Sequence, residues 1–372
     1  MDKSIPVQNI YYLLCYSWNQ LEEAELIAVQ NEACPTLQDL FAVVLSRGTQ
    51  RLIRRGFHRA YVSHVEESAN LRGRIALTPS IRDLSWVRGR MHCEFSELSY
   101  NVLPNHILKT TLRNLFYANG LEKKTREAVG DVLRALDPVE PIRLSGVLFR
   151  RIQYNQNMRF YRFLLNVCEL VFESMIPSED GGTTHFRDFL RDPKKMPNLF
   201  EGFVRNFYRH HATGWKVHPG NKVIQWFGLD GPEDAQTLVP RMETDVELEN
   251  GIHRIILDCK FYLNAFSTHY EKSSFHSSNL YQLYAYLRNS ALHNPELKHS
   301  GVLLYPETGK AFRHSIVLQG FPITFASVNL DQPWRKIHDE LLQIQSPNSE
   351  RSRTTGWVPR PIIKDDGLTE TQ

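Results

Sequence analysis

The chain has 372 residues, more than a single hydrophobic core usually organises, so we expect two domains. Its composition, 42% hydrophobic and 23% charged, is typical of an ordinary water-soluble globular protein. The formal net charge of +3 does not identify a nucleic-acid-binding protein, so any basic surface must come from an uneven distribution of charge.

The five cysteines are scattered along the chain, and no two of them form a C-x-x-C pair. This arrangement argues against a disulfide framework and against a cysteine-based zinc site. The chain has no uninterrupted run of about 18 apolar residues and no recognisable secretory signal. We therefore expect a cytoplasmic protein without a membrane span.

The first 150 residues predict an N-terminal domain of mixed α+β structure. Apolar residues at helical spacing predict helices within residues 5–48, and alternating residues around the turn LRGRIAL predict short strands within 61–95. Two further helices are expected at 105–119 and 123–135. Prolines at 138 and 141 then break the pattern, so we place the domain boundary near residue 150.

Arginine is concentrated between Arg47 and Arg90, a stretch with ten arginines, no lysine and three acids. Because arginine forms bidentate contacts with phosphate and guanine, this stretch is a candidate surface for DNA or for an anionic partner. The alternative is a solvated face whose acids come from elsewhere in the fold, and both interpretations stay open. The candidates are Arg72, Arg74, Arg82, Arg88 and Arg90.

Residues 151–346 predict a second domain of α/β type. A helix is expected at 159–175, and from residue 199 the chain is predicted to form helix, strand, strand, helix and strand in turn. The polar, proline-containing residues 347–372 predict a flexible tail.

The most informative part of this second domain is a predicted β-hairpin. Asn250-Gly251 lies between two β-rich runs, which is a strong signal for a two-residue type I′ turn. Such a turn places Glu249 opposite Ile252. A turn of three residues would instead move one strand's side chains to the other face, so the register is a testable part of the prediction.

The two-residue turn brings three charged side chains to one face of the hairpin. Asp245 is predicted opposite Ile256, with Asp258 one diagonal step away, and Lys260 shares the face because strand side chains alternate. Hydrolysis of a phosphodiester needs a divalent cation to neutralise the phosphate and activate water, and Mg²⁺ prefers carboxylate oxygens. A lysine beside the metal can orient or deprotonate that water.

An exposed hairpin that carries these charges only for solubility is the alternative interpretation. The apolar neighbours of Asp258 and Lys260 argue against it, because unpaired charges are unfavourable in a buried strand. We therefore interpret Asp245, Asp258 and Lys260 as catalytic residues, with the two aspartates as metal ligands.

Polar residues on two flanking helices are accessory candidates. Glu201 precedes the hairpin on an apolar stretch and is either an accessory acid of the metal site or a solvated residue. Gln282 and Tyr286 lie four residues apart on one helix face, one turn after Asn279. These three side chains are predicted to contact the substrate phosphate or to steady the lysine, while the apolar side of their helix packs in the core.

Several motifs together resemble one known family. The pair RMETD and ILDCKFY, followed by KSSFHSSNLYQLYAYL, is similar to the catalytic core of the PD-(D/E)xK nuclease superfamily. The whole chain from about residue 5 to 345 resembles the McrC family of nuclease subunits from modification-dependent restriction systems. The motifs that carry this second resemblance are IPVQNIYYLLCYSW at 5–18, GRI at 73–75, ELSYNVLPNHILK at 97–109 and LLYP at 303–306.

This resemblance implies more than the residues themselves establish. It implies a central mixed sheet flanked by helices, Mg²⁺ as cofactor, and cleavage of double-stranded DNA that carries a modified cytosine such as 5-methylcytosine. It also implies a partner, an McrB-like hexameric AAA+ GTPase that binds the GTP and that the N-terminal domain engages and stimulates. This expectation is consistent with the lack of a G-x-x-x-x-G-K-[ST] phosphate loop in the chain.

Two alternatives from different functional classes remain. A free-standing Mg²⁺-dependent DNA nuclease would cut DNA without a motor partner. A catalytically inactive adaptor would activate a partner ATPase or GTPase without cutting, although the intact set of two aspartates and a lysine argues against it. One departure from the superfamily pattern is Thr244, which stands where a proline often precedes Asp245.

Overall fold

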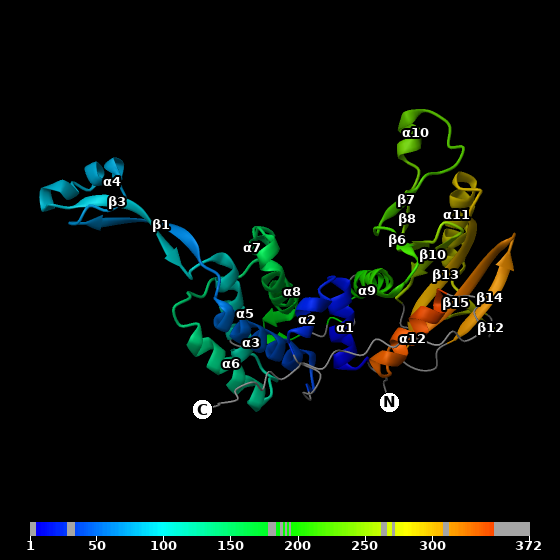
Figure 1. Ribbon diagram of the computed structural model, residues 1–372, viewed down its shortest axis with the longest axis horizontal. Coiled ribbons are helices and arrows are strands. Elements are labelled where there is room, and N and C mark those ends of the chain that lie inside the picture. Colours follow the sequence, from blue (N-terminus) through cyan, green and yellow to red (C-terminus); the bar gives the residue numbers. More distant parts are fainter. Residues whose placement is uncertain are drawn as a thin grey trace, which may run out of the picture.

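The computed structural model describes residues 5–27, 34–177, 184–186, 189, 192, 195–261, 266–269, 272–307 and 312–345. The predicted tail at 347–372 lies outside the described residues. The chain forms an elongated molecule in which a helical body joins a projecting arm at one end to a β-sheet region at the other (Figure 1). Within the described residues, every helix is too short or too polar to cross a membrane.

The helical body contains most of the N-terminal half and confirms the predicted helices there. Thr36 begins the long third helix, where its side chain accepts the backbone N–H of Asp39 at 3.1 Å and so satisfies an otherwise unpaired donor. The elements are α1 (Val7–Ser17), α2 (Leu21–Glu25), α3 (Leu37–Arg55), α5 (Leu103–Tyr117), α6 (Lys123–Ala135), α7 (Gly146–Arg150), η2 (Gln156–Met158), α8 (Arg159–Ser174) and the strand pair β4 (Met175–Pro177) and β5 (Thr184–Phe186).

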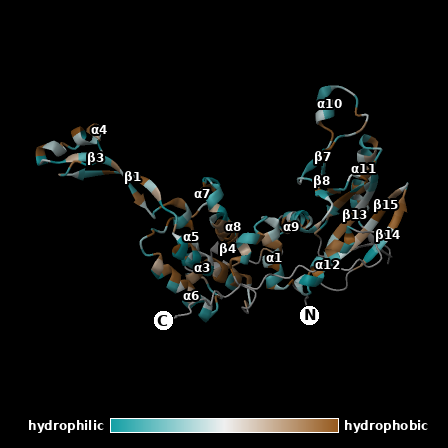
Figure 2. Cartoon of the chain, viewed as in Figure 1, coloured by the Kyte–Doolittle hydropathy of each residue, from teal (hydrophilic) through white to brown (hydrophobic). Residues whose placement is uncertain are grey.

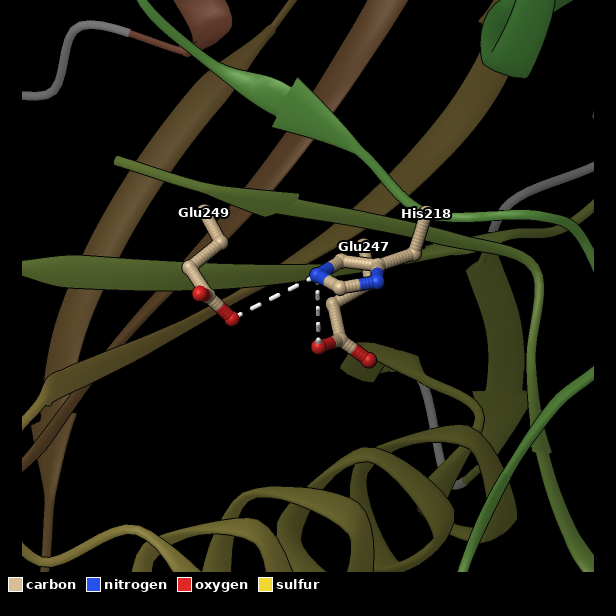
Figure 3. Close-up of side chains that lie close together, drawn as sticks. All are labelled: His218, Glu247 and Glu249. Atoms are coloured by element: carbon tan, nitrogen blue, oxygen red, sulfur yellow. Dashed lines mark hydrogen bonds and ion pairs between the residues drawn. The ribbon is translucent and has the colours of Figure 1, made fainter. Parts of the chain in front are cut away.

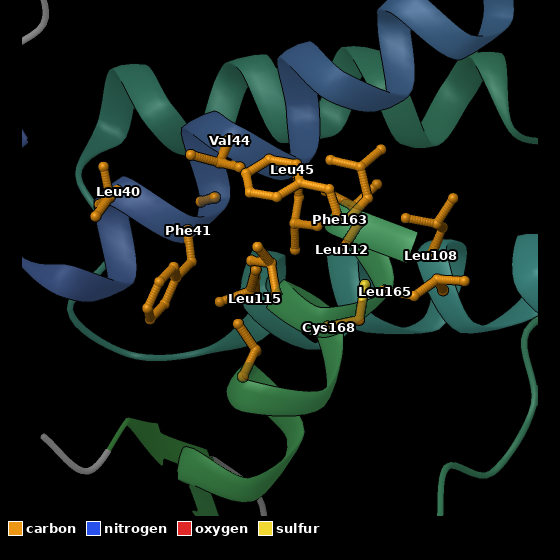
Figure 4. Close-up of a cluster of buried hydrophobic side chains, with 14 of the residues drawn as sticks. Leu40, Phe41, Val44, Leu45, Leu108, Leu112, Leu115, Phe163, Leu165 and Cys168 are labelled. Carbon is orange, nitrogen blue, oxygen red and sulfur yellow. The ribbon is translucent and has the colours of Figure 1, made fainter. Parts of the chain in front are cut away.

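The core of this body is built from the apolar faces of α3, α5 and α8, which meet as Figure 4 shows. Phe163, Leu164 and Cys168 of α8 are fully buried in the same cluster as residues of α3 and α5. A boundary at residue 150 would separate α8 from these neighbours. We therefore propose that the N-terminal domain extends through α8, beyond the boundary expected from the prolines.

The arm is a twisted antiparallel ribbon with two short helices at its tip. Its elements are β1 (Ala60–Ser68), β2 (Arg74–Ile75), α4 (Leu77–Arg82), η1 (Ser85–Arg88) and β3 (Met91–Ser99), with sheet order β1-β3-β2. Gly73, in the predicted LRGRIAL turn, has φ +65, and an added Cβ would lie 2.3 Å from the carbonyl oxygen of Glu94. Only glycine fits there, so this turn requires the residue that the sequence supplies.

The C-terminal region is organised around a six-stranded mixed sheet, as expected. Its strand order is β14-β15-β13-β10-β9-β6, with β10, β13 and β15 parallel and the other pairs antiparallel. The strands are β6 (Lys216–Val217), β9 (Val246–Glu249), β10 (His253–Cys259), β13 (Lys298–Glu307), β14 (Arg313–Leu318) and β15 (Phe321–Asn329).

Helices cover both faces of this sheet. The apolar residues of α9 (Lys195–His211) and α12 (Trp334–Ile344) pack with Val246, Leu248 and Ile255 on one face. The other face packs Ile256 against α11 (Ser277–His293). Smaller elements complete the region: β7 (Lys222–Ile224), α10 (Glu233–Thr237), β8 (Met242–Thr244), β11 (Phe266–His269) and β12 (Lys272–Phe275).

The β9–β10 hairpin forms as predicted, but its register is different. Glu249 pairs with Arg254 instead of Ile252, so four residues and not two lie between the last paired residues of the hairpin. The reason is the side chain of Asn250, whose Oδ1 accepts the backbone N–H groups of Ile252 and His253 at 3.1 and 2.7 Å and closes the longer loop. The shift is an even number of residues, so the side chains keep the faces that were predicted for them.

Candidate functional site

Asp245 stands at a bend between β8 and β9, beside the end of β10. Its Oδ2 accepts the backbone N–H of Cys259 at 2.7 Å, a contact that fixes one oxygen of the carboxylate. The hairpin register, continued by one pair, brings Asp245 level with Asp258. The structure therefore brings together the two aspartates that sequence reasoning selected, although by a different register.

Asp258 is almost completely buried, with 1% of its surface exposed. Nζ of Lys260 lies 3.0 Å from its Oδ2 as an ion pair, yet among the described residues neither oxygen has an aligned hydrogen-bond donor. Burial raises the pKa of the Asp258 carboxyl to about 6, against the attraction of Lys260, and the charge of Asp245 raises it further. The oxygens of a buried carboxylate that accept no hydrogen bond are available as ligands for a cation.

Lys260 is held from two sides. Its Nζ contacts Asp258 and also donates to Oε1 of Gln282 on α11 at 2.9 Å. Nε2 of Gln282 in turn donates to the hydroxyl of Tyr286 at 2.7 Å. The structure thus places Gln282 and Tyr286 beside the lysine, as the spacing on their helix predicts.

Glu201, on α9, reaches the same place from the other face of the sheet. Burial raises the pKa of its carboxyl to about 7, the nearby charge of Asp245 adds to the rise, and the guanidinium of Arg205 opposes it. Arg205 forms an ion pair with Glu201 one helical turn away. Sequence reasoning missed Arg205, although its spacing of four residues from an acid on a helix was a visible signal.

The three carboxyl groups of Glu201, Asp245 and Asp258 converge with mutually unfavourable charges. Burial is the largest cause of the raised pKa of each carboxyl group. The charge of Asp245 raises the pKa values of Glu201 and Asp258 further. A divalent cation bound among hard carboxylate oxygens would relieve this repulsion. The donor set and the unsatisfied oxygens of Asp258 therefore fit Mg²⁺.

Other predicted residues lie elsewhere. Asn279 is buried, and its amide donates to the hydroxyl of Tyr305 on β13 at 3.4 Å. All five candidate arginines lie in the arm, and four of them make ion pairs with its own acids: Arg72 with Glu66 and Glu97, Arg74 with Glu94, Arg82 with Asp83, and Arg88 with Glu67.

The arm as a whole is therefore nearly neutral. Residues 58–101 contain six arginines and five acids, which leaves a net charge of +1. The acids at 94 and 97 lie just beyond the arginine-rich stretch and approach it because β3 pairs with β1 and β2. This pairing supports the alternative of a solvated face, and DNA contact by these arginines stays a prediction.

A second charged cluster lies on the α11 face of the sheet and includes Glu247, two residues after Asp245. Ligand atoms of His218, Glu247 and Glu249 lie within 4.8 Å of one another (Figure 3). Two cations already neutralise the carboxylates, since Glu247 contacts Nζ of Lys222 at 2.6 Å and Nε of Arg254 at 3.1 Å. We interpret the cluster as an ion-pair network that stabilises the hairpin.

This interpretation predicts that Arg254→Ala destabilises the fold by about 3 kcal/mol. The reason is that the carboxylate of Glu247, which is 1% exposed, loses the more deeply buried of its two cationic partners. Urea unfolding of the variant measures the change. Arg134→Ala removes a comparable but exposed ion pair with Asp131 and is the control, with an expected change within about 0.5 kcal/mol. Equal changes in the two variants would show that the network contributes nothing beyond surface charge.

Comparison with known proteins agrees with the motifs. The model of the McrBC family, described as McrBC 5-methylcytosine restriction system component, matches residues 7–306. The chain is 32% identical over 340 residues to a protein of Escherichia coli K12 described as Type IV methyl-directed restriction enzyme EcoKMcrBC, a match that covers 91% of this chain and 97% of that protein.

The fold is similar to that of a chain in a refined half-complex from a tetradecameric assembly of Thermococcus gammatolerans McrB AAA+ hexamers with bound McrC. The TM-score is 0.56 with 17% identity, and the match covers 92% of this chain and 76% of that chain. The family match extends over most of the chain and the E. coli relative is similar over nearly its whole length. The chain therefore belongs to the family of McrBC 5-methylcytosine restriction system components.

Proposed function

We propose that this chain is the McrC-like endonuclease subunit of a modification-dependent restriction complex, with a nuclease centre of the PD-(D/E)xK type. The single observation that carries the proposal is the convergence of Asp245, Asp258 and Lys260 beside Glu201 on a buried hairpin. Three largely buried carboxylates that repel one another are unfavourable in such a place unless a cation joins them. The sheet with helices on both faces supports the same assignment.

In this site Asp245 and Asp258 would hold Mg²⁺, with Glu201 as an accessory carboxylate. The bound ion would neutralise the phosphate and lower the pKa of the attacking water. Lys260, positioned between Asp258 and Gln282, would orient that water and stabilise the negative charge that develops on the phosphate oxygens. Because Tyr286 fixes Gln282, the lysine is held before substrate arrives.

We further propose that the arm docks on an McrB-like AAA+ GTPase hexamer, which binds the GTP and recognises the modified cytosine of double-stranded DNA. The arm lacks a buried cluster of its own but exposes large apolar side chains around α4 and η1, and hydrophobic segments are visible there in Figure 2. Exposed apolar patches of this kind mark protein interaction sites. The exposed side chains at this tip are Leu71, Ile75, Leu77, Ile81, Leu84, Trp86 and Val87.

The decisive experiment is cleavage of modified and unmodified plasmid by the purified chain with Mg²⁺, with and without the partner and GTP. An Asp258→Ala, Lys260→Ala variant accompanies the wild type. Cleavage that needs the partner, GTP and both residues supports the proposal. Cleavage by the chain alone supports the free-standing nuclease. Stimulation of the partner's GTPase without any cleavage supports the inactive adaptor and contradicts the nuclease.

The lysine contact leads to a separate prediction. Gln282→Leu removes the acceptor that positions Lys260 and the donor to Tyr286, so the cleavage rate at saturating DNA is expected to fall about 10- to 100-fold with little change in the DNA concentration for half-maximal rate. Steady-state cleavage kinetics measure both quantities. Tyr281→Leu, at an exposed neighbouring position of the same helix, is the control, and a matching loss there would contradict the prediction.

A further inference from the structure

Arg205 occupies a confined position next to the proposed metal site. Its side chain is about one-fifth exposed and forms an ion pair with Glu201 on the same helix. Its Nε is buried and has no hydrogen-bond partner among the described residues. The positive charge of Arg205 also lowers the pKa of the Asp245 carboxyl, against the larger effect of burial.

Gly220 packs against the guanidinium of Arg205 on its other side. An added Cβ at Gly220 would lie 1.6 Å from Nη1 of Arg205, 2.1 Å from its Cζ and 2.6 Å from its Nε. The guanidinium therefore lies directly against the backbone of residue 220, in the loop that leads into β7. Gly220 does not have a positive φ, so alanine is compatible with its backbone and is excluded only by the arginine.

We propose that Arg205, held against Gly220, is a positioning residue that keeps the carboxylate of Glu201 directed at the metal site formed with Asp245 and Asp258. This inference rests on the proposed nuclease function and adds two residues to it. A glycine at 220 is required because any side chain would displace the arginine, and Glu201 would then lose its fixed partner. The other possibility is an ordinary helical ion pair, which stabilises α9 slightly and has no effect on metal binding.

The sign of one measurement separates the two possibilities. Arg205→Ala removes a positive charge beside the carboxylates, and electrostatics alone would then strengthen the binding of a divalent cation. Loss of positioning acts in the opposite direction, because removal of an outer partner of a metal ligand typically weakens metal binding about 10- to 100-fold. We therefore expect weaker binding, against the electrostatic trend.

The experiment measures Mn²⁺ binding to the full chain by titration calorimetry, in parallel with cleavage kinetics and melting temperature. The variants are Arg205→Ala, Gly220→Ala and the double variant. Gly220→Ala retains the charge and changes only the position of the arginine, because the arginine is a flexible side chain that can move away from the new Cβ. Gly146→Ala, at a glycine with no atom within 4 Å of an added Cβ, is the control.

We expect Arg205→Ala and Gly220→Ala each to weaken Mn²⁺ binding about 10-fold, and the double variant to be no weaker than Arg205→Ala alone. Cleavage is expected to need correspondingly more metal, with an unchanged DNA concentration for half-maximal rate. Unchanged or tighter Mn²⁺ binding in either single variant would overturn the inference. So would lower melting temperatures with normal Mn²⁺ binding. Failure of the nuclease proposal itself gives a different result. The wild type would then bind no Mn²⁺, or Asp258→Ala would bind Mn²⁺ as well as the wild type does.

Discussion

Asp258→Asn is expected to abolish metal-dependent cleavage of DNA and, at the same time, to stabilise the folded protein. The variant replaces a proposed metal ligand by a neutral amide that binds Mg²⁺ poorly. Removal of this carboxylate should lower cleavage at least about 1,000-fold, the scale on which single catalytic groups act. Plasmid cleavage with the partner present measures this loss.

The gain in stability follows from the pKa of Asp258, which burial raises to about 6 from a usual value of 3.8. The folded state binds the proton more tightly than the unfolded state, so this group's contribution to stability falls as pH rises from about 4 to about 6. The shift corresponds to about 3 kcal/mol at neutral pH. Burial outweighs the attraction of Lys260, and Lys260 is expected to keep its bond to Gln282 in the variant.

Urea unfolding in the absence of divalent metal, at pH 5 and pH 8, measures this effect. The wild type should lose more stability between the two pH values than Asp258→Asn, and the variant should be the more stable protein at pH 8. Asp131→Asn, at an exposed acid on α6, is the control and should behave as the wild type. A variant that is less stable at pH 8 would show that the Lys260 ion pair dominates.

The second large effect is expected at the tip of the arm. Replacement of Leu77, Trp86 and Val87 by serine should weaken binding to an McrB-like partner at least about 100-fold and abolish stimulation of its GTPase. These side chains are 61, 46 and 73% exposed, so they contribute little to the fold and are available to a partner. The melting temperature should therefore change by less than about 2 °C.

The control is an equivalent change on another surface. Ile316→Ser with Val317→Ser removes two exposed apolar side chains from β14, on the sheet at the opposite end of the molecule (Figure 1). Surface plasmon resonance with the partner and GTP measures affinity for both variants. Similar losses in the two variants would contradict a docking role for the arm, and normal binding by the arm variant would exclude it.

Local patterns predicted much of this protein because their causes are local. The helices α5 and α6 lie within two residues of the predicted bounds at both ends, since apolar spacing and helix-ending residues act within a few positions. The sequence also predicted that Asp245, Asp258 and Lys260 form a candidate catalytic set. They share a face because side chains alternate along a strand. The predicted register was wrong by two residues, an even number, so the predicted face stayed the same.

Other features were not predictable because they depend on contacts between distant residues. Besides the nearby Glu66, Arg72 pairs with Glu97, and Arg74 pairs with Glu94; these two acids lie 20 or more residues later in the chain, and only strand pairing brings them close. The packing of α8 beyond the expected boundary at residue 150 has the same origin. Prolines mark where a local pattern stops, whereas a domain ends where long-range apolar contacts stop.

The sequence by itself determined the element types, the candidate catalytic triplet and the family motifs, because residue chemistry and short spacing carry that information. Tertiary structure alone decided that Glu201 reaches the site from α9, that Asp258 is buried deeply enough to raise its pKa, and that Gly220 confines Arg205. These outcomes depend on desolvation and on the close approach of segments that are far apart in the chain. Neither quantity exists until the sheet and its two helical layers have assembled.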